Sequence, residues 1–425
     1  MRVCFPPPFF FWQYSSTQRK PKRLHLPKIK REVEMHLCVR MQFALRSLFI
    51  LCLLFVVLAT TKVSAEALMA GWDPFAVAEE EGLLQRLNSL PQFHAKSWLK
   101  VGASSRGGKP TVPVNTQVVV NVSTATGERR FVLYVPDSYM QNGNSTAALQ
   151  LYFHGLNDQC DRFLNAINAI EHAKKTGFVM ASLCGSEGYI GTAWNVGTSC
   201  GFFSEEHPDD FDFAEKVVES VSASLGVHFT RVMAVGFSNG AMMAEGLGCR
   251  KPKLIRAVVS VGGVVALRPG NEGGLEECSR ALRTDNEEGY RPSVLMVHGK
   301  LDVVVPMDGE KFLGFPPLNT NVRSWTESNG CRKAPKTLNT SKYVTQVYTD
   351  CRSVPDEFGS RMKSYWIRAK NSVQEGLTGQ KMASTRQSIV EFVLALQEGH
   401  SWPSDNEFST TEHIFDFAQR VFFSE

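Results

Sequence analysis

The chemistry suggested by this sequence centres on a serine between two glycines. Residues 232–235 form an apolar run, residues 236–240 (Gly-Phe-Ser-Asn-Gly) follow directly, and residues 241–247 are rich in helix formers. A strand, a sharp turn and a helix around Gly-x-Ser-x-Gly are typical of a nucleophile elbow, which exposes a serine hydroxyl above a sheet. Glycine is expected on both sides because a side chain there would collide with the neighbouring strand or helix. The pattern predicts Ser238 as a nucleophile.

A second stretch also fits this pattern. Residues 197–201 (Gly-Thr-Ser-Cys-Gly) place Ser199 between two glycines. Residues 192–196 before it do not form a clean strand, and residues 201–208 after it cannot begin a helix smoothly, so the context that defines an elbow is missing. We therefore interpret Ser199 as a loop residue.

A serine hydroxyl is a poor nucleophile at neutral pH, so it needs a histidine as base and a carboxylate that orients the histidine. When a serine lies on such an elbow, the acid and then the histidine follow it in the chain. Asp302 comes just after the apolar strand 294–298, at the edge where parallel sheets place ligands. Its rival Asp308 lies beside Gly309, as in a surface turn. The alternative for Asp302 is a turn cap.

Three histidines follow Ser238 in the chain: His298, His400 and His413. His400 lies between the last predicted strand and the last predicted helix, where the triad histidine is expected. His298 ends a strand and His413 lies in the first turn of a helix, so both favour structural roles. We predict His400 as the base.

Two backbone N–H groups are expected to face the oxyanion that forms during acyl transfer. One is the N–H of Asn239, directly after the nucleophile. The other is the N–H of Leu156, in the loop after the predicted strand 148–153. Such a triad needs no metal and no organic cofactor.

Strands and helices alternate along most of the chain, which predicts an α/β fold with a mostly parallel sheet covered by helices on both faces. The expected strands are 117–122 and 130–135 (a hairpin joined through 124–128), 148–153, 178–183, 231–235, 256–261, 293–298, 363–368 and 389–396. The expected helices are 162–175, 211–225 and 410–423, with a possible one at 75–90, and residues 369–388 resemble a surface insertion.

The first 65 residues have the layout of a basic leader and signal peptide. Residues 48–59 form an uninterrupted apolar run, too short for a membrane span, and small residues follow at 63–65. Because the basic leader is long, we expect translation to begin at Met35 or Met41. The alternative is an uncleaved signal anchor that tethers the protein to the membrane.

We expect residues 66–114 to be a lead-in or linker and residues 115–425 to form the domain. The formal net charge of +4 arises from the leader: residues 1–65 hold 11 Lys/Arg and two acidic residues, which leaves 35 Lys/Arg against 40 Asp/Glu in residues 66–425. This balance argues against a nucleic-acid partner. The oligomeric state is left open.

Seven cysteines follow residue 65, and export favours disulfides. Cys331 and Cys351 flank one short segment, and Cys249 and Cys278 flank another, so these are the expected pairs. The odd count leaves one thiol free or paired between chains. No Cys-x-x-Cys spacing suggests a zinc site. Glycosylation sequons are present at Asn121, Asn144 and Asn339.

Several motifs together resemble the secreted esterase family of polyhydroxybutyrate depolymerases and feruloyl esterases, from about residue 116 to the C-terminus, interrupted by 369–388. The motifs are His154-Gly155, residues 236–240, residues 298–306 (His-Gly-x-x-Asp-x-x-Val-Pro), residues 325–331 (Trp-x-x-x-Asn-Gly-Cys) and residues 399–403 (Gly-His-x-Trp-Pro). The sequence departs from the family at 156–157, which lack the usual Cys or extra Gly, and at Gln397-Glu398, which replace glycines.

The resemblance implies an α/β-hydrolase fold and serine carboxylesterase chemistry on a small-molecule or polymer ester, carried by Ser238, Asp302 and His400. His154, Trp194 and Trp402 are then expected at the substrate pocket; the alternative is that both tryptophans are core aromatics. Two rival functions stay open: a serine peptidase of the prolyl-peptidase type on the same fold, and a non-catalytic secreted binding protein.

Overall fold

The computed structural model describes residues 92–94, 112–142, 147–188, 191–197, 208–267, 273–284, 286, 289–311, 313–355 and 385–423. All described residues belong to one compact unit, Glu81–Glu425. The predicted signal peptide, the helix at 75–90, the strand at 363–368 and Ser199 lie outside the described residues.

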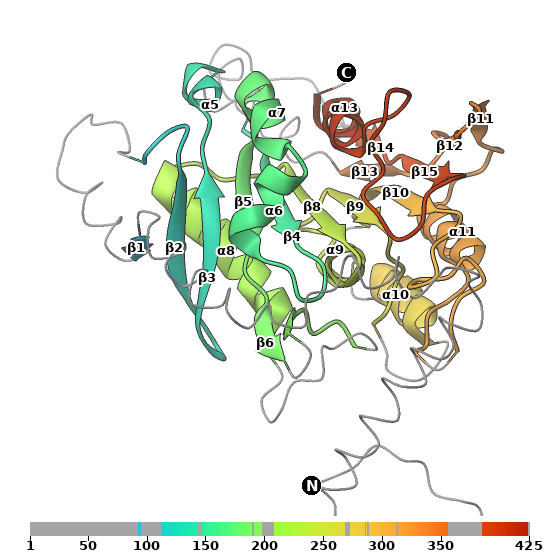
Figure 1. Cartoon of the computed structure of the whole chain (residues 1–425), viewed down its shortest axis with the longest axis horizontal. Helices are drawn as coiled ribbons and strands as arrows, with labels where there is room; N and C mark the ends of the chain where they lie inside the picture. Colours follow the sequence, from blue (N-terminus) through green and yellow to red (C-terminus); the bar gives the residue numbers. More distant parts are fainter. Residues whose placement is uncertain are drawn as a thin grey trace, which may run out of the picture. The chain divides into compact units, whose positions relative to one another are not determined.

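An eleven-stranded sheet forms the centre of this unit, in the order β1-β2-β3-β5-β4-β8-β9-β10-β15-β12-β11 (Figure 1). The strands from β5 to β15 in this order run parallel, while β2, β3, β12 and β11 form antiparallel pairs toward its two ends. Their bounds are β1 Gln92–His94, β2 Gln117–Thr124, β3 Gly127–Tyr134, β4 Leu149–Phe153, β5 Val179–Leu183, β8 Val232–Phe237, β9 Ala257–Val261, β10 Ser293–Gly299, β11 Lys336–Asn339, β12 Tyr343–Tyr348 and β15 Val390–Ala395. Two small two-stranded sheets join β6 Ser186–Gly188 to β7 Gly191–Ala193 and β13 Ser353–Pro355 to β14 Thr385–Gln387.

Helices cover both faces of the sheet. Figure 1 shows α6 and α7 in front of the sheet and α8 behind it. The side chains on one face pack with α8, α9, α10 and α11, and those on the other face pack with α6, α7 and α13. The bounds are α5 Asp137–Asn142, α6 Cys160–Ala166, α7 Ala169–Thr176, α8 Asp210–Leu225, α9 Asn239–Arg250, α10 Gly273–Thr284, α11 Leu318–Ser328 and α13 Thr410–Phe423.

The central strands are buried on both faces, as their composition requires. Every residue of β4, β5, β9 and β10 is buried, because helices cover both sides of a parallel sheet and leave no face for polar alternation. The predicted α/β fold is thus confirmed, and its strand order and two helical layers are those of an α/β-hydrolase. Within the described ranges, no helix is both long and apolar enough to cross a bilayer.

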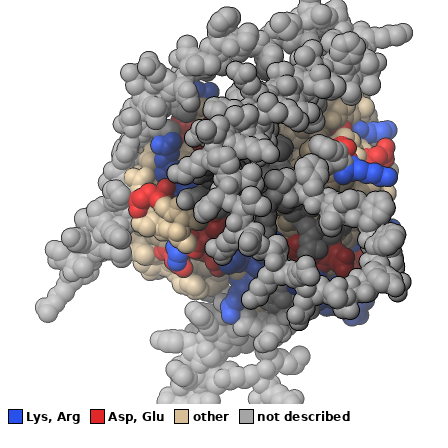
Figure 2. All heavy atoms as spheres, turned by 90° about the horizontal axis from the view of Figure 1, so that it is seen from below, with Lys and Arg blue, Asp and Glu red and all other residues tan. Residues whose placement is uncertain are grey.

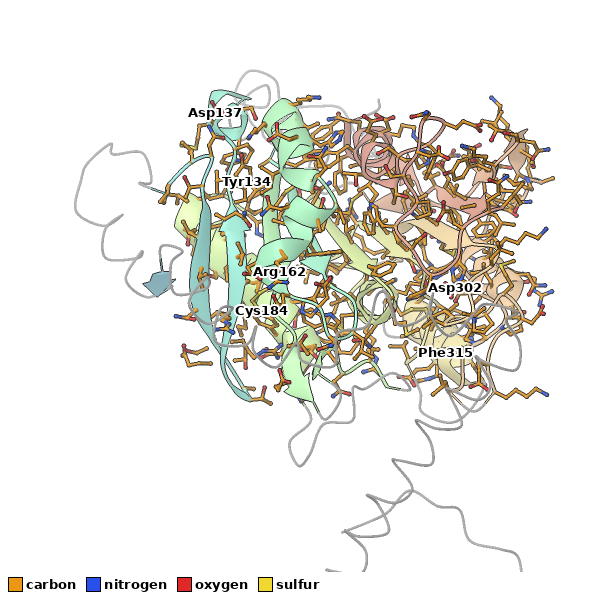
Figure 3. The ribbon with its side chains drawn as sticks, viewed as in Figure 1. Tyr134, Asp137, Arg162, Cys184, Asp302 and Phe315 are labelled. Carbon is orange, nitrogen blue, oxygen red and sulfur yellow. A yellow bond between two sulfur atoms is a disulfide. The ribbon has the colours of Figure 1, made fainter. Side chains whose placement is uncertain are left out.

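The carboxyl ends of the parallel strands meet at one edge of the sheet. In Figure 3, Asp302 after β10 and Cys184 after β5 lie on the lower side, while Asp137 lies toward the opposite edge. This lower edge is where open α/β sheets place their ligands. The loops that carry the candidate site residues gather there.

One expectation about the elements needs correction, and another is described only in part. The predicted helix 162–175 is two helices, α6 and α7, because Asn168 adopts a left-handed backbone (φ 56°), a conformation that asparagine tolerates and a continuous helix does not. The predicted insertion 369–388 is described only at its end, where β14 pairs with β13 and Ser388 is buried.

Candidate active site

The elbow around Ser238 has the geometry that its glycines imply. Strand β8 ends at Phe237, α9 begins at Asn239, and Ser238 between them has φ 54° and ψ −122°, which is strained for a residue with a side chain. A Cβ on Gly236 would overlap the carbonyl of Gly240, and one on Gly240 would overlap the carbonyl of Phe153. The Ser238 N–H donates to the carbonyl of Val261 at 2.9 Å, which ties the turn to β9.

Asp302 lies in the turn after β10 and is almost fully buried. Its Oδ1 accepts hydrogen bonds from the N–H groups of Val304 and Val305 at 2.9 and 2.8 Å, so it does cap the turn, as the alternative held. Its Oδ2 faces His400. Burial acts to raise the pKa of Asp302, but the hydrogen bonds from His400 and Val305 outweigh burial and lower it overall. The carboxylate therefore stays ionised.

His400 joins Asp302 to Ser238. Its Nδ1 lies 2.7 Å from Asp302 Oδ2 and its Nε2 lies 2.8 Å from Ser238 Oγ. With an ionised carboxylate as acceptor, Nδ1 carries the proton and Nε2 is left to accept the serine O–H. The ring packs against Phe237, with centroids 5.1 Å apart, and against Gly262, where a Cβ would be 3.3 Å from the ring. The three side chains predicted from sequence thus form one hydrogen-bonded chain.

The rival residues lie elsewhere or have other partners. His298 Nε2 donates to the carbonyl of Val305 at 2.8 Å and lies 3.4 Å from Asp302 Oδ2. His298 therefore stabilises the turn that contains Asp302. Burial lowers the pKa of His298. His413 Nε2 donates to Glu391, 2.6 Å away, and Asp308 is exposed in a turn.

The loop after β4 is held by the His154 ring. Nε2 accepts the N–H of Gly185 at 3.0 Å, so Nδ1 must carry the proton that it donates to the Gly155 carbonyl at 2.7 Å. Burial lowers the pKa of His154, which keeps the ring neutral. Because C=O and N–H point in opposite directions in a trans peptide, the Leu156 N–H points away from His154. A Cβ on Gly155 would be 3.6 Å from Cβ of Ser238, so this peptide lies beside the nucleophile.

Two of the three expected pocket residues lie behind the site instead of on its surface. His154 and Trp194 are essentially unexposed, at 1% and 0%. The Trp194 indole donates to the carbonyl of His154 at 2.8 Å, and its backbone N–H donates to Asn239 Oδ1 at 2.8 Å. Such full burial corrects the expectation of a pocket wall: Trp194 is a core aromatic that fixes the loops around Ser238.

Trp402 remains available to a substrate. It is partly exposed, its indole donates to Thr411 at 3.0 Å, and its ring packs against Phe163 and Phe237. Sequence reasoning missed Gly262, which lies against the His400 ring, and Gly185, which fixes the His154 tautomer. Gly262 directly follows β9, and Gly185 is the second residue after β5, so both lie at the carboxyl end of a parallel strand. That position was the sequence signal that could have identified them.

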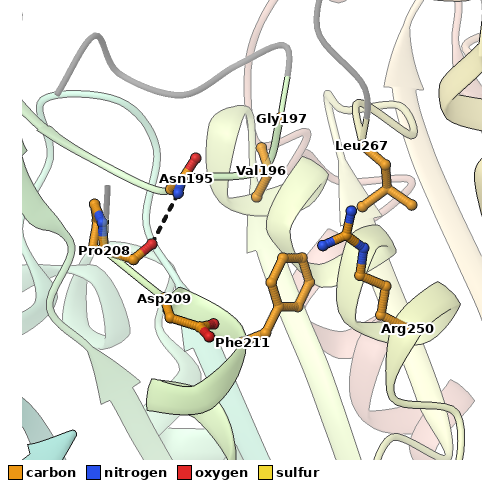
Figure 4. A pocket seen from close by; sticks show the side chains of 8 residues that line it. All are labelled: Asn195, Val196, Gly197, Pro208, Asp209, Phe211, Arg250 and Leu267. Atoms are coloured by element: carbon orange, nitrogen blue, oxygen red, sulfur yellow. Dashed lines mark hydrogen bonds between the residues drawn. The ribbon is translucent and has the colours of Figure 1, made fainter. Parts of the chain in front are cut away.

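A cavity of about 350 Å³ opens among the residues drawn in Figure 4. It is lined by Asn195, Val196, Gly197, Pro208, Asp209, Phe211, Arg250 and Leu267. None of Ser238, Asp302 and His400 lines it. We therefore do not assign this cavity to the reacting ester.

Within the described ranges, no three His, Cys, Asp or Glu side chains come together to hold a metal ion.

The cysteines and sequons fall as follows. Both expected disulfides, Cys249–Cys278 and Cys331–Cys351, are confirmed, and a third, Cys160–Cys184, was not expected. Cys200 and the Asn144 sequon lie outside the described residues. Asn339 is exposed at the end of β11, whereas Asn121 is partly buried in β2 between β1 and β3.

The face seen in Figure 2 carries acidic and basic side chains side by side.

No family model matches the chain. The chain is 26% identical over 224 residues to feruloyl esterase B of Piromyces equi, a match that covers 53% of this chain and 40% of that protein. It is 27% identical over 249 residues to the probable feruloyl esterase C of Aspergillus flavus, covering 55% of this chain and 80% of that protein. The chain thus spans less than half the length of the Piromyces protein.

Solved structures with a similar course of the chain include two esterases. Acetyl xylan esterase from Aspergillus awamori has 15% sequence identity and a TM-score of 0.47, with 72% of this chain and 98% of that chain covered. The feruloyl esterase module from Clostridium thermocellum has 11% identity and a TM-score of 0.42, with 75% and 93% covered.

Proposed function

We propose that this chain, a feruloyl esterase-like α/β-hydrolase, is a secreted serine carboxylesterase with Ser238 as nucleophile, His400 as base and Asp302 as the acid that orients the base. The observation that carries the proposal is the hydrogen-bonded chain from Ser238 Oγ through His400 to Asp302, with distances of 2.8 and 2.7 Å. A serine on a strained elbow with both partners in place is equipped for acyl transfer.

In the acylation step, His400 Nε2 takes the proton of Ser238 as Oγ attacks the ester carbonyl carbon. The carbonyl π electrons move to oxygen, and the tetrahedral intermediate carries that oxyanion. When it collapses, the bond to the alcohol oxygen breaks and His400 Nε2 returns the proton to the leaving alcohol. Water then repeats the sequence on the acyl-enzyme: His400 takes its proton, the acid is released and Ser238 Oγ is reprotonated.

The N–H groups of Leu156 and Asn239 are the proposed oxyanion donors. The Asn239 N–H lies at the N-terminus of α9, where the helix dipole favours negative charge. The Leu156 N–H is oriented by the His154–Gly155 hydrogen bond. This support comes from the backbone, so the exposed side chain of Leu156 has no part in it.

For the acyl group we propose a hydroxycinnamate such as a feruloyl ester. The relatives in two fungal genera are named as feruloyl esterases. The partly exposed Trp402 ring packs edge-to-face against Phe237 beside His400, and its free part offers an aromatic acid a contact of the same kind. Acetyl and hydroxybutyryl esters are the alternatives from the wider resemblance.

A fluorophosphonate probe tests the central claim. We expect one covalent adduct, mapped to Ser238 by peptide mass spectrometry, and none in Ser238→Ala. Hydrolysis of methyl ferulate, aryl acetate and hydroxybutyrate esters then ranks the acyl groups, with a peptide amide as the test for peptidase activity. Labelling elsewhere, or equal ester turnover by Ser238→Ala, would refute the assignment. A labelled protein that cleaves only the amide would favour the peptidase.

Secretion is the second part of the proposal. Three disulfides support an oxidising compartment. The exposed sequon at Asn339 is the better glycosylation candidate, since Asn121 lies within the sheet. N-terminal sequencing of the mature protein should begin near Glu66, and a retained 48–59 segment would indicate the signal anchor instead.

A further inference from the structure

The proposed mechanism does not use Glu245, one of the fully buried carboxylates in the described part of the chain. Glu245 lies in α9, two helical turns after Ser238, and its side chain is 0% exposed. Removing a carboxylate from water is costly unless hydrogen bonds compensate it. The partners of Glu245 therefore indicate what this residue holds in place.

Three donors from two other elements converge on Glu245. Oε1 accepts the hydroxyl of Ser260 in β9 at 2.6 Å. Oε2 accepts Asn321 Nδ2 at 3.0 Å and Trp325 Nε1 at 2.7 Å, both from α11. Burial raises the pKa of Glu245, and these hydrogen bonds act against that rise. Since a serine hydroxyl can donate or accept, the same connections can form whether Oε1 is ionised or protonated.

One branch of this network leads to the nucleophile. Ser260 precedes Val261, whose carbonyl accepts the N–H of Ser238. The hydrogen bond from Ser260 to Glu245 thus joins the end of β9 to the middle of α9, the helix that begins directly after Ser238. The elbow is held from both sides by elements that Glu245 connects.

The other branch leads to the base. Asn321 Oδ1 accepts the N–H of Val265 at 3.1 Å, in the loop that follows β9. The first residue of that loop, Gly262, has φ 62° and lies against the His400 ring. Its N–H donates to the carbonyl of Val297 at 2.9 Å. Asn321 therefore fixes the loop that contacts the histidine while it donates to Glu245.

We propose that Glu245 is a positioning residue for the esterase reaction: through Ser260 and through Asn321 it sets the spacing between Ser238 and His400. This inference rests on the proposed function. Its physical basis is that one buried carboxylate accepts hydrogen bonds from the strand that holds the nucleophile and from the helix that holds the loop beside the base. A small shift of strand β9 or of the loop beside His400 alters the Ser238–His400 hydrogen bond.

The test compares two α11 residues that donate to the same oxygen. Asn321→Leu and Trp325→Phe each remove one hydrogen bond to Glu245 Oε2, but only Asn321 also binds the loop beside His400. We expect Asn321→Leu to lower kcat about 10- to 100-fold on a soluble aryl ester, with KM changed less than about 3-fold. Trp325→Phe should keep kcat within about 2-fold of wild type even where its Tm falls.

A second set of variants keeps the test valid if Asn321→Leu does not fold. Glu245→Gln can still accept from Asn321 and Trp325 and can donate to Ser260, so kcat should stay within about 3-fold of wild type. Ser260→Ala removes the branch toward Ser238 alone, and should lower kcat together with the rate of fluorophosphonate labelling.

The outcomes separate this inference from the proposed function. If Asn321→Leu and Trp325→Phe lower kcat equally, in step with their loss of Tm, the network is only structural and the inference is wrong. It is also wrong if Glu245→Gln loses as much activity as Asn321→Leu, because charge, and not connection, would then matter. Failure of the wild-type protein to react with the fluorophosphonate would instead refute the proposed function.

Discussion

Two buried carboxylates, Asp302 and Glu391, each accept a hydrogen bond from a histidine, yet their surroundings differ. Asp302 follows β10 at the carboxyl edge of the sheet and binds His400 at 2.7 Å. Glu391 is the second residue of β15, paired in register with Leu295, and binds His413 at 2.6 Å. The second pair therefore lies nearer the opposite edge, away from the elbow.

The remaining partners set the two pairs apart. In the first pair, the second ring nitrogen of His400 faces Ser238 Oγ. In the second pair, the other carboxylate oxygen of Glu391 accepts a hydrogen bond from Arg420 Nη2 at 2.7 Å. Burial acts to raise the pKa of each carboxyl, and in both cases the hydrogen-bond partners outweigh burial and lower it. A carboxylate–histidine pair is thus not a catalytic feature in itself. What distinguishes His400 is a serine held within reach of its second nitrogen.

Making the same substitution in His400 and in His413 tests most directly whether only the first pair is catalytic. We expect His400→Asn to lower kcat by about 10⁵- to 10⁶-fold, because the serine loses its base. His413→Asn should keep kcat within about 3-fold and lower only the Tm. Steady-state assays with an aryl ester and thermal melts of both variants check this. Comparable activity in the two variants would remove His400 from the mechanism.

Exchanging each carboxylate for its amide gives the next largest effect. Asp302→Asn should lower kcat about 10⁴-fold, because the amide no longer fixes the His400 tautomer or stabilises the imidazolium. Glu391→Gln should leave kcat within about 3-fold and cost stability instead. The measurement is kcat at a temperature where both variants are folded, as monitored by circular dichroism. A severe kcat loss in Glu391→Gln with an intact fold would contradict the distinction.

The pair around Asp302 could be anticipated from sequence, and the pair around Glu391 could not. Asp302 and His400 follow predicted strands, and the carboxyl ends of parallel strands meet at one edge whatever the details of packing. The contact between Glu391 and His413 depends on how α13 lies across β15, which no local pattern encodes. The same holds for Glu245, whose partners come from β9 and α11.

Hydrophobic patterns within single segments explain which of the other helices and strands could be predicted from sequence. The hydrophobic periodicity of α8 and α13 and the apolar runs of β4 and β10 place these elements within a residue or two. Helix α11 was not predicted, since few of its residues are apolar and its buried face includes Asn321. The break between α6 and α7 depends on the backbone of Asn168, a residue that tolerates but does not require the left-handed conformation.

The pH dependence of stability should report on the Glu391 pair. The folded-state pKa of Glu391 is lowered, so its contribution is fully present above the unfolded-state value of about 4.3 and is lost as pH falls through the folded-state value. We expect wild type to exceed Glu391→Gln by about 1 to 3 kcal/mol in free energy of unfolding at pH 7, and the difference to shrink below about pH 4. Urea titrations at pH 7, 5, 4 and 3 measure it. A constant difference across that range would mean that Glu391 does not titrate with folding.

The smallest expected effect concerns Asp308, the rival acid six residues beyond Asp302. Asp308 is exposed, and none of the hydrogen bonds that hold His400 involves it. Asp308→Asn should therefore change kcat by less than about 2-fold and the free energy of unfolding by less than about 0.5 kcal/mol. Both aspartates lie between β10 and α11, so the two amide variants differ only in which carboxylate is lost. A kcat loss in Asp308→Asn near that of Asp302→Asn would show that an acid in this loop acts through its charge, without contact with the histidine.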